Sequence, residues 1–246
     1  VAPLEFIFLA DAYFQDKGIR DQVDLTYVTP LDGAFTKPIA AKHLGNLLED
    51  KAINLESDFY LERVDAEEKK LVSYDEREID YDLLVTIPLN MGADVIARSG
   101  LGNEGNFVPV DSGNFVSKEY DNIFALGDAA DLPTSKAVSV AHFAVEVFAE
   151  NFLRYIEGLP MLLEFDGHAN CFIETGFSKA LLIDFNYENE PVQGHYPGPV
   201  GLPLLKESRA NHLGKLMFQS FYWHGLLPGR DIPGIGPDMP KFGKKQ

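Results

Sequence analysis

Helical spacing of apolar residues alternates with short apolar runs along the first third of the chain. Apolar residues recur every three to four positions over residues 3–16 and 38–48, which predicts two helices that each bury one face. Short apolar runs predict strands at residues 23–28, 58–64, 69–74 and 80–86. This order of helices and strands predicts an α/β fold.

A strand, a tight turn and a long helix are expected in the middle of the chain. Residues 122–126 form an apolar run of strand length, Gly127 and Asp128 follow it directly, and an apolar helix is expected from Ala137 onward. Glycine lets a ligand approach the backbone closely, and open α/β sheets bind ligands at the carboxyl ends of their strands. We therefore predict a ligand-binding turn at Gly127, with an ordinary strand-turn-helix unit as the alternative.

A β-hairpin and a final helix are expected in the last third. Residues 169–174 and 180–185 have the apolar pattern of strands and flank Gly176. A loop rich in proline and glycine over residues 191–203 then leads to an amphipathic helix.

These patterns divide the chain into three segments, residues 1–88, 89–160 and 161–246. The first two have the element order of Rossmann-like dinucleotide-binding units, both incomplete on their N-terminal side, and the third holds the hairpin and an amphipathic helical tail. The chain begins with Val1 rather than methionine, inside an expected helix. We therefore interpret it as part of a longer protein.

Composition narrows the possible partners. The 246 residues carry a net charge of -17, which disfavours nucleic acid because no basic stripe is available to neutralise phosphates. A single cysteine, Cys171, excludes an internal disulfide framework. The sequence has no apolar run long enough to span a bilayer, and its histidines lack the spacing of metal ligands.

Two signals for a nucleotide site weaken in their context. Residues 100–105 match G-x-G-x-x-G, but they follow a helix-like segment and precede a strand-like one, which is the reverse of the phosphate-binding fingerprint. The strand expected at residues 23–28 ends at Thr29 without the acidic residue that grips the ribose of NAD. We therefore expect a vestigial or repurposed nicotinamide-type unit rather than a working NADH site.

Four motifs together carry a resemblance to a known family. They are Ala2-Pro3 with Ala12-Tyr13-Phe14 in the first helix, Gly127-Asp128, the run LPTSK at residues 132–136, and DGHANC at residues 166–171. In these motifs the chain resembles the C-terminal two thirds of the sulfide:quinone oxidoreductases, which are FAD-dependent proteins related to the disulfide oxidoreductases. The resemblance covers nearly the whole chain, but the N-terminal glycine-rich FAD turn has no counterpart in it.

The resemblance implies a position for FAD in the second segment. Residues 89–160 would form the C-terminal part of the FAD-binding domain, with the helix after Ala137 aimed at the flavin. Lys136 would add positive charge near the flavin and favour its reduced form, and a solvated surface lysine is the alternative. The residues implied to contact FAD are Gly127, Asp128, Ala129, Lys136 and Ala137.

The resemblance also implies that Cys171 is redox-active. Its partner cysteine would lie just before Val1, sulfide would attack the disulfide, and Cys171 would carry the persulfide while electrons pass through FAD to a quinone. His168 would assist as a proton acceptor, although residues three apart on a strand face opposite ways. A buried structural cysteine is the alternative for Cys171.

The tail differs in charge from the rest of the chain. Residues 203–246 hold seven lysines and arginines against three aspartates and glutamates, a net charge of +4 that leaves -21 for residues 1–202. Apolar and aromatic side chains gather on one face of its expected helix, which suits a segment lying in a membrane surface. A core or dimer-interface helix is the alternative. The residues expected to contact the quinone or the membrane are Phe172, Phe218, Phe221, Tyr222 and Trp223.

The sequence therefore predicts a peripheral membrane enzyme that acts on sulfide and a quinone, on a cytoplasmic or periplasmic face, with homo-oligomers possible. A flavocytochrome-type sulfide dehydrogenase and an NADH:quinone oxidoreductase are the alternatives among enzymes. A third alternative is a folding or interaction module without flavin or redox thiol.

Overall fold

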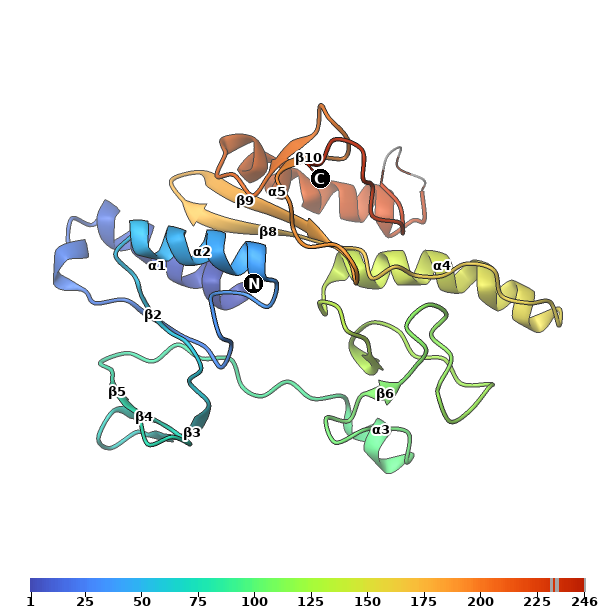
Figure 1. Cartoon of the computed structure of the whole chain (residues 1–246), viewed down its shortest axis with the longest axis horizontal. Helices are drawn as coiled ribbons and strands as arrows, with labels where there is room; N and C mark the ends of the chain where they lie inside the picture. The colour runs from blue at the N-terminus through green and yellow to red at the C-terminus, as the bar shows by residue number, and fades with distance from the viewer. Residues whose placement is uncertain (231, 233–234, 246) are drawn as a thin grey trace.

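The computed structural model of the chain describes residues 1–230, 232 and 235–245. Its central layer is an antiparallel hairpin of β8 (Ala169–Gly176) and β9 (Lys179–Phe185), in which Cys171 pairs with Ile183. Figure 1 shows this hairpin between helices on two sides. Successive side chains of a strand point to opposite faces, so each face of the hairpin needs its own cover.

Two helices cover one face of the hairpin. α1 (Ala2–Asp16) starts with a proline in its first turn and buries Leu4 and Phe8 against the strands. α4 (Val138–Ile156) contributes Val140, Phe143, Ala144 and Val147 to the same core cluster. The hairpin's own contribution comes from alternate positions, as the pleat requires. These positions are Ala169, Ile173, Leu181, Ile183 and Phe185.

The other face packs against the C-terminal elements. α5 (Arg209–Phe221) is capped at its N-terminus by Ser208, whose hydroxyl accepts a hydrogen bond from the Asn211 amide. Asn211 is fully buried, and its Nδ2 lies within hydrogen-bond distance of three backbone carbonyls, which it shares between two N–H donors. These contacts fix α5 on the hairpin. β10 (Gly194–Tyr196) and β11 (Leu202–Leu204) pair antiparallel and add Tyr196 and Leu204 to a small core cluster on this side.

A first lobe carries small sheets beside α1. β1 (Thr26–Val28) pairs parallel with β2 (Asn54–Glu56), and α2 (Pro38–Asp50) connects the two. β3 (Leu61–Asp65), β4 (Lys70–Ser73) and β5 (Glu78–Asp80) form an antiparallel sheet. The short helix η1 (Arg20–Gln22) holds this lobe to α1, because Arg20 pairs with the buried Asp11 at 2.7 Å.

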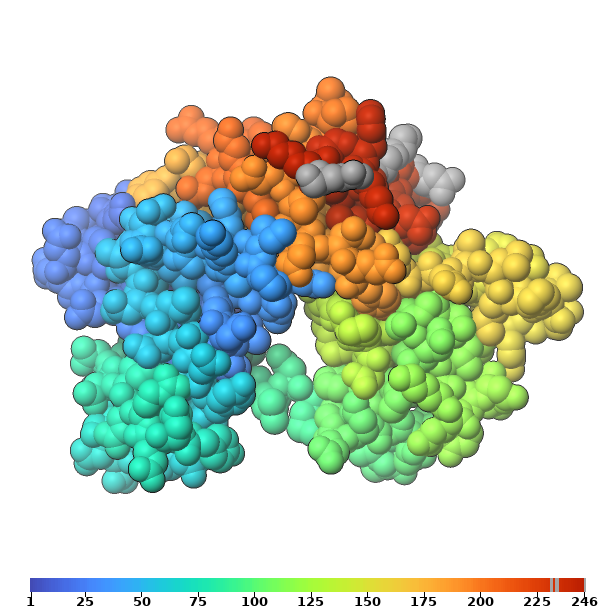
Figure 2. Space-filling view, in the orientation of Figure 1, coloured from blue at the N-terminus to red at the C-terminus, as the bar shows by residue number. Residues whose placement is uncertain are grey.

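A second lobe lies next to the N-terminal end of α4. It contains α3 (Asp94–Arg98), a parallel pair of β6 (Val108–Pro109) and β7 (Ala130–Asp131), and the short helix η2 (Gly127–Ala129). Residues 81–93 have no helix or strand and cross from the first lobe to the second. Figure 2 shows the two lobes side by side beneath the layer of the hairpin.

Most expected helices and the hairpin are confirmed, whereas two expected strands are wrong. The expected strand ends at Asp80. The following residues bend at Asp82 and Leu83, and most of them are exposed, with Leu83 81% exposed, because no neighbouring strand among the described residues pairs with them. Residues 122–126 form a single isolated bridge at Phe124, whose ring packs on Phe148 of α4 at 5.4 Å. Both segments are apolar, but residues 82–86 have no strand beside them in the described part of the chain, and residues 123–125 form only a short bridge with residues 115–117.

The close packing of α1 on the hairpin turn leads to a stability prediction. Gly176 has a φ of +89°, and a Cβ at this position would overlap the Cβ of Ala12. Gly176→Ala should lower the free energy of unfolding by about 2 to 5 kcal/mol, from backbone strain and overpacking together. Urea denaturation measures the change.

Gly18→Ala is the matched control for this variant. Gly18 also has a positive φ, +69°, but nothing lies near its Cβ position. Gly18→Ala should lower the free energy of unfolding by only about 1 to 2 kcal/mol, which is the contribution of backbone strain alone. Equal losses for the two variants would contradict the packing of α1 on the turn.

Candidate functional site

Cys171 lies on the face of β8 that packs towards α1 and α4, where it contacts the main core cluster. Charged groups surround it from several elements. They are the Val1 amino group, Glu5, Asp184 and Lys215. The Val1 amino group is itself close enough for its charge to interact with Cys171, so the start of α1 faces the thiol.

Burial dominates the acidity of Cys171. Although part of the residue reaches solvent, loss of water around the sulfur raises the pKa of the thiol to about 11. The Val1 amino group lowers this pKa and the Asp184 carboxylate raises it further. The free thiol is therefore protonated at neutral pH, which makes it a poor nucleophile in this state.

Two side-chain hydrogen bonds join the segment before Cys171 to the segment that leads into α4. Ser139, in the first turn of α4, donates from Oγ to the Asn170 carbonyl at 3.1 Å. Thr134, in the LPTSK run, donates from Oγ1 to the Gly167 carbonyl at 3.1 Å. These bonds bring the start of α4 next to the strand that carries Cys171, although about 30 residues separate them in sequence.

The turn expected to bind FAD lies against the same end of α4. Gly127 has a φ of +56°, a conformation that other residues rarely adopt, and its Cα faces the Ala141 side chain of α4. Asp128, next in the turn, is exposed. Ala129 packs against the core cluster of the second lobe.

Lys136 is exposed, but its amino group contacts the second lobe. Its Nζ donates to the Ala130 carbonyl at 2.7 Å and lies 4.3 Å from the centre of the Phe107 ring. Partial burial lowers the pKa of Lys136, while the carboxylates of Asp128 and Asp131 raise it. The lysine and the two carboxylates are therefore close enough for their charges to interact.

The residues at this turn fit one side of a flavin nucleotide. Ala137 precedes α4 and gives no side-chain cap, so the first-turn amides of α4 can donate hydrogen bonds to a group outside the helix. Asp128 offers a carboxylate to a hydroxyl, and Lys136 offers a cation near the same helix end. Helix amides and a cation suit the anionic edge of a flavin ring, and a carboxylate suits the hydroxyls of the chain attached to it.

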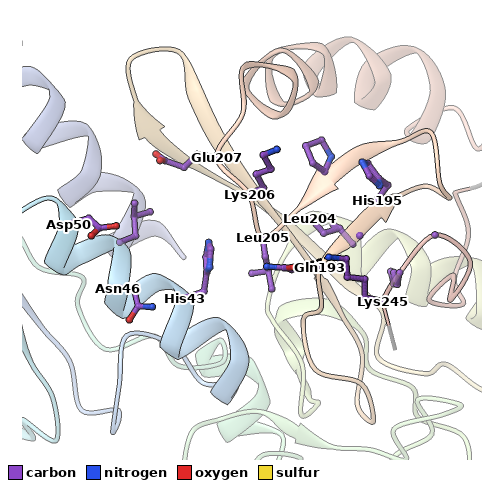
Figure 3. A pocket seen from close by; sticks show the side chains of 15 residues that line it. His43, Asn46, Asp50, Gln193, His195, Leu204, Leu205, Lys206, Glu207 and Lys245 are labelled. Carbon is purple, nitrogen blue, oxygen red and sulfur yellow. Dashed lines mark hydrogen bonds between the residues drawn. The ribbon is translucent and has the colours of Figure 1, made fainter.

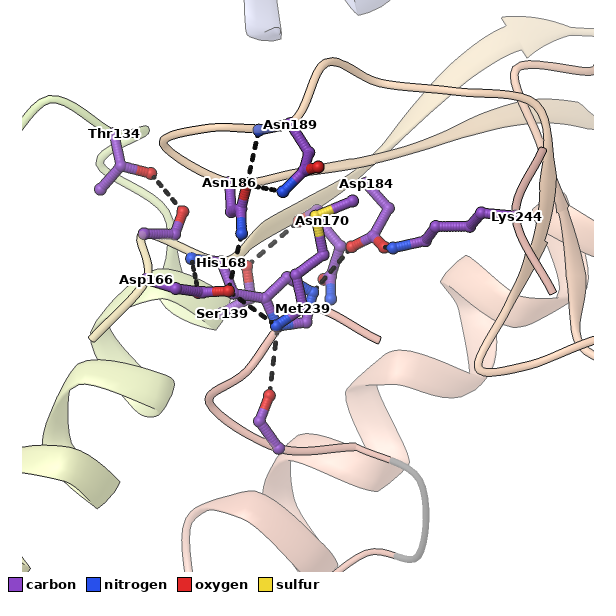
Figure 4. A network of polar contacts seen from close by, with 12 residues as sticks. Thr134, Ser139, Asp166, His168, Asn170, Asp184, Asn186, Asn189, Met239 and Lys244 are labelled. Carbon is purple, nitrogen blue, oxygen red and sulfur yellow. Dashed lines mark hydrogen bonds and ion pairs between the residues drawn. The ribbon is translucent and has the colours of Figure 1, made fainter. Parts of the chain in front are cut away.

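His168 is fully buried in a polar network behind β8 (Figure 4). Its Nε2 lies 2.7 Å from Oδ1 of Asp184 and its Nδ1 lies 3.1 Å from the Gly236 carbonyl. Its ring stacks on Phe143 of α4 with 4.6 Å between centres. Both ring nitrogens are therefore bonded to groups other than Cys171, and an effect on the thiol has to pass through this network.

The rest of the DGHANC motif is also held by hydrogen bonds. Asp166 accepts from the amides of His168 and Met239 and from the side chain of Asn186, at 2.7 to 3.0 Å. Gly167 has a φ of +81°, and a Cβ there would overlap the Tyr187 ring. The motif therefore sets the geometry of the segment that leads into Cys171.

The aromatic residues expected to contact a quinone or the membrane fall into two groups. Phe172 points away from Cys171, into the small cluster under α5, where its ring lies near Gly214. Phe221 and Trp223 are 47% and 56% exposed. Phe218 and Tyr222 are partly buried with tilted rings 6.4 Å apart, in α5 and in the π-helical turn η3 (Tyr222–Leu226) that follows.

A cavity of about 770 Å³ lies elsewhere, between α2 and the β10–β11 hairpin (Figure 3). His43 and Asn46 of α2 line one side, and His195, Lys206 and Lys245 line the other. It contains none of the residues expected to bind FAD and does not include Cys171. In the described ranges no helix is both long and apolar enough to cross a membrane, and no three metal-binding side chains converge.

Asp184 and Lys244 are the functional candidates that the sequence did not suggest. Their side chains form a buried ion pair next to His168, with Lys244 3% exposed and Asp184 not exposed. Asp184 stands in the apolar run of β9, so a charge at a buried strand position was the available signal. Lys244 is one of several lysines near the C-terminus, and its position alone carries no such signal.

Comparisons with known proteins first define the class. The structure of the sulfide:quinone oxidoreductase from Aquifex aeolicus matches 92% of this chain and 55% of its own chain, with a TM-score of 0.73 and 16% identity. The chain therefore has the mixed α/β fold of the flavin-dependent oxidoreductases. No family model matches the sequence.

The particular resemblance comes from the sequences. The mitochondrial sulfide:quinone oxidoreductase of Dictyostelium discoideum is 29% identical over 236 residues, 93% of this chain and 51% of that protein. The expected resemblance to the sulfide:quinone oxidoreductases is thereby confirmed. The chain spans about half the length of the curated relatives it matches.

A further solved structure comes from a different assembly. A chain in the cryo-EM structure of the Tetrahymena thermophila mitochondrial ATP synthase is 25% identical to this chain. The match covers 73% of this chain and 46% of that one, with a TM-score of 0.62.

The raised pKa of Cys171 leads to a prediction about its reactivity. Only the thiolate reacts with iodoacetamide, and a pKa of about 11 against a reference of 9.0 leaves about a hundredfold less thiolate at pH 8. The alkylation rate, followed by mass spectrometry, should reach half its maximum near pH 11. The urea-unfolded chain is the control and should reach half its maximum near pH 9; a folded chain with the same midpoint would contradict the prediction.

Proposed function

We propose that this chain forms part of a flavin-dependent enzyme that oxidises sulfide through Cys171 and passes the electrons to a quinone. The observation that carries the proposal is the meeting of three features at one place. The start of α1 faces Cys171, and the first turn of α4 is hydrogen-bonded to Asn170 beside it. The Gly127 turn lies on that same end of α4.

The proposed thiol chemistry needs a partner cysteine upstream of Val1 in the whole protein. Hydrosulfide would attack the sulfur of Cys171 in a disulfide; the bond between the two cysteines breaks and a new S–S bond forms a persulfide on Cys171. The electron pair leaves on the partner cysteine as a thiolate. The position of Val1 supports this arrangement, because it puts the residues before α1 next to the Cys171 thiol.

In the proposed enzyme the Gly127 turn would hold FAD, which would supply the two-electron acceptor between the cysteine pair and a quinone. Gly127, Asp128 and Ala129 would hold one edge of the nucleotide, and Lys136 with the Ala137 end of α4 would favour negative charge on the ring. Burial of Cys171 fits a residue that works as a disulfide and a persulfide, since neither needs a free thiolate at rest.

The proposal has a direct test at Cys171. In the flavin-loaded whole protein, Cys171→Ser should keep the fold and the flavin, because the change is nearly isosteric. Reduction of the flavin by sulfide should fall by roughly a thousandfold or more, since no disulfide remains to be opened. Stopped-flow bleaching of the flavin measures the rate.

Reduction by dithionite is the control, because it needs no thiol and should be unchanged. If sulfide bleaches the serine variant as fast as the wild-type protein, Cys171 is a core residue and the proposed activity is wrong.

We also propose that the tail attaches the protein to a membrane surface, as a peripheral contact. Leu213, Leu216, Met217 and Phe221 are each 47% to 60% exposed along α5, an arrangement that costs free energy in water. Exposed Lys206 and Arg209 lie near the start of the helix, where they suit anionic lipid headgroups. A quinone is collected from the bilayer, so such a contact fits the proposed substrate.

Removing the exposed apolar side chains should release the protein from lipid. Replacing Leu216, Met217 and Phe221 together by serine should weaken binding to anionic liposomes about a hundredfold, at roughly 1 kcal/mol for each side chain. Co-sedimentation with liposomes measures the partition. The matched control replaces Leu83, Leu89 and Val200, which are 81% to 97% exposed outside the tail, and should change nothing.

The same triple variant also tests the alternative that α5 faces protein. Unchanged liposome binding combined with a lower oligomeric state would assign the exposed face of α5 to a protein interface instead.

A second candidate function is an interaction module without redox activity. The match to a chain in the Tetrahymena thermophila ATP synthase structure favours this candidate, because the matched chain is part of a large assembly. The two candidates differ in the stopped-flow experiment. An interaction module would bind no flavin and would not react with sulfide, whether Cys171 is present or not.

A further inference from the structure

The C-terminal strap, residues 235–245, runs back from the tail across the β8–β9 hairpin. The Met239 amide donates to Asp166 at 3.0 Å, and the Gly236 carbonyl lies 3.1 Å from Nδ1 of His168. Further along the strap, the Lys244 side chain pairs with Asp184 of β9. Backbone hydrogen bonds from His195 to Gly243 and from Lys245 to Gln193 attach the end of the strap beside β10.

We infer that Lys244, Asp184 and His168 form a positioning network through which the C-terminal strap sets the electrostatic environment of Cys171. The geometry carries this inference. Asp184 pairs with Asn170, the neighbour of Cys171, and Cys171 pairs with Ile183, the neighbour of Asp184. Asp184 and Cys171 are thus close neighbours along both strands of the hairpin. Their side chains point to opposite faces, so the carboxylate acts on the thiol through the thickness of the sheet.

The network is buried, so its charges act strongly. The side chains of His168 and Asp184 are not exposed, and that of Lys244 is 3% exposed. Phe143 stacks on one side of the imidazole, and Tyr196 meets it edge to face at 5.9 Å between ring centres. In such surroundings a single charge left without its partner is costly and its field is little screened.

Lys244 offsets the negative charge that Asp184 places near the thiol. The other charged groups facing Cys171 are the Val1 amino group, Glu5 and Lys215, and the last two pair with each other across α1 and α5. Asp184 is thus the acid near Cys171 whose counter-ion comes from the strap. Loss of contact between the strap and β9 would expose Cys171 to the uncompensated carboxylate and disfavour its thiolate.

The effect of this network on catalysis rests on the proposed redox role of Cys171. A persulfide and a thiolate at this residue are both sensitive to nearby charge. Lys244, Asp184 and His168 are positioning residues, since they act through the hairpin and not on a substrate. Through this network, a change in the tail that moved the strap would reach the sulfur chemistry.

Opposite effects of two variants test the network. Cys171 is the single cysteine of this 246-residue chain, so iodoacetamide reports on it alone. Asp184→Asn should raise the alkylation rate at pH 8 about three- to tenfold and shift the pH profile to lower pH, by removing a nearby negative charge. Lys244→Met should lower the rate by a similar factor and shift the profile to higher pH.

A purely structural role would not give this pattern, because loosening the hairpin should accelerate alkylation in both variants. Lys241→Met, an exposed lysine of the same strap, is the matched control and should leave the profile unchanged. If Lys244→Met does not fold, as judged by circular dichroism, the double variant Asp184→Asn with Lys244→Met removes both charges. Its profile should lie between those of Asp184→Asn and Lys244→Met, close to wild type, because both charges are removed together.

The inference is overturned if Asp184→Asn leaves the profile within twofold of wild type, or if Lys244→Met accelerates the reaction. These outcomes are independent of the proposed enzyme activity. Alkylation needs neither flavin nor sulfide, so a failure of sulfide oxidation in the Cys171→Ser experiment would leave this result standing.

Discussion

Burial of both faces of the β8–β9 hairpin is the constraint on which the rest of the structure depends. A hairpin alone is marginally stable in water, and this one becomes stable by packing α1 and α4 on one face and α5 with β11 on the other. The same alternation that puts Ile173 and Leu181 in the main core points Phe172 and Leu182 to the opposite side. Cys171 therefore takes its orientation from the packing pattern of the strand, before any chemistry is considered.

The DGHANC motif shows how one short segment serves structure and chemistry together. Asp166, Gly167 and His168 are held by hydrogen bonds, a positive φ and ring stacking, and the Asn170 carbonyl accepts a bond from α4. Each of these contacts would fix the strand even if Cys171 were inert. A match to this motif is therefore evidence for the geometry around the cysteine, and the redox role needs the nearness of α1 and of the Gly127 turn as separate support.

The sequence predicted well where local pattern decides structure and poorly where a distant partner does. The helices and the hairpin follow from apolar spacing and turn residues, which act within a few positions. Residues 80–86 and 122–126 look like strands, yet the first pairs only at Asp80 and the second forms one bridge, to Val116. No local signal reports how far such pairing extends. The convergence of Cys171, the Gly127 turn and the helix after Ala137 depends on tertiary packing and was implied only by the family resemblance. The Ser139 contact and the Lys244–Asp184 pair were visible in neither the local pattern nor the resemblance.

The basic charge of the tail has a physical explanation that does not involve lipid. Lys215 pairs with Glu5 of α1, and Lys244 pairs with Asp184 of β9, so two of its seven basic residues neutralise acids of the preceding segment. A basic tail on an acidic body is thus partly an internal arrangement that holds the tail down. Charge alone is weak support for a membrane contact, and the argument rests instead on apolar side chains such as Leu216 and Phe221, which the fold leaves exposed on α5.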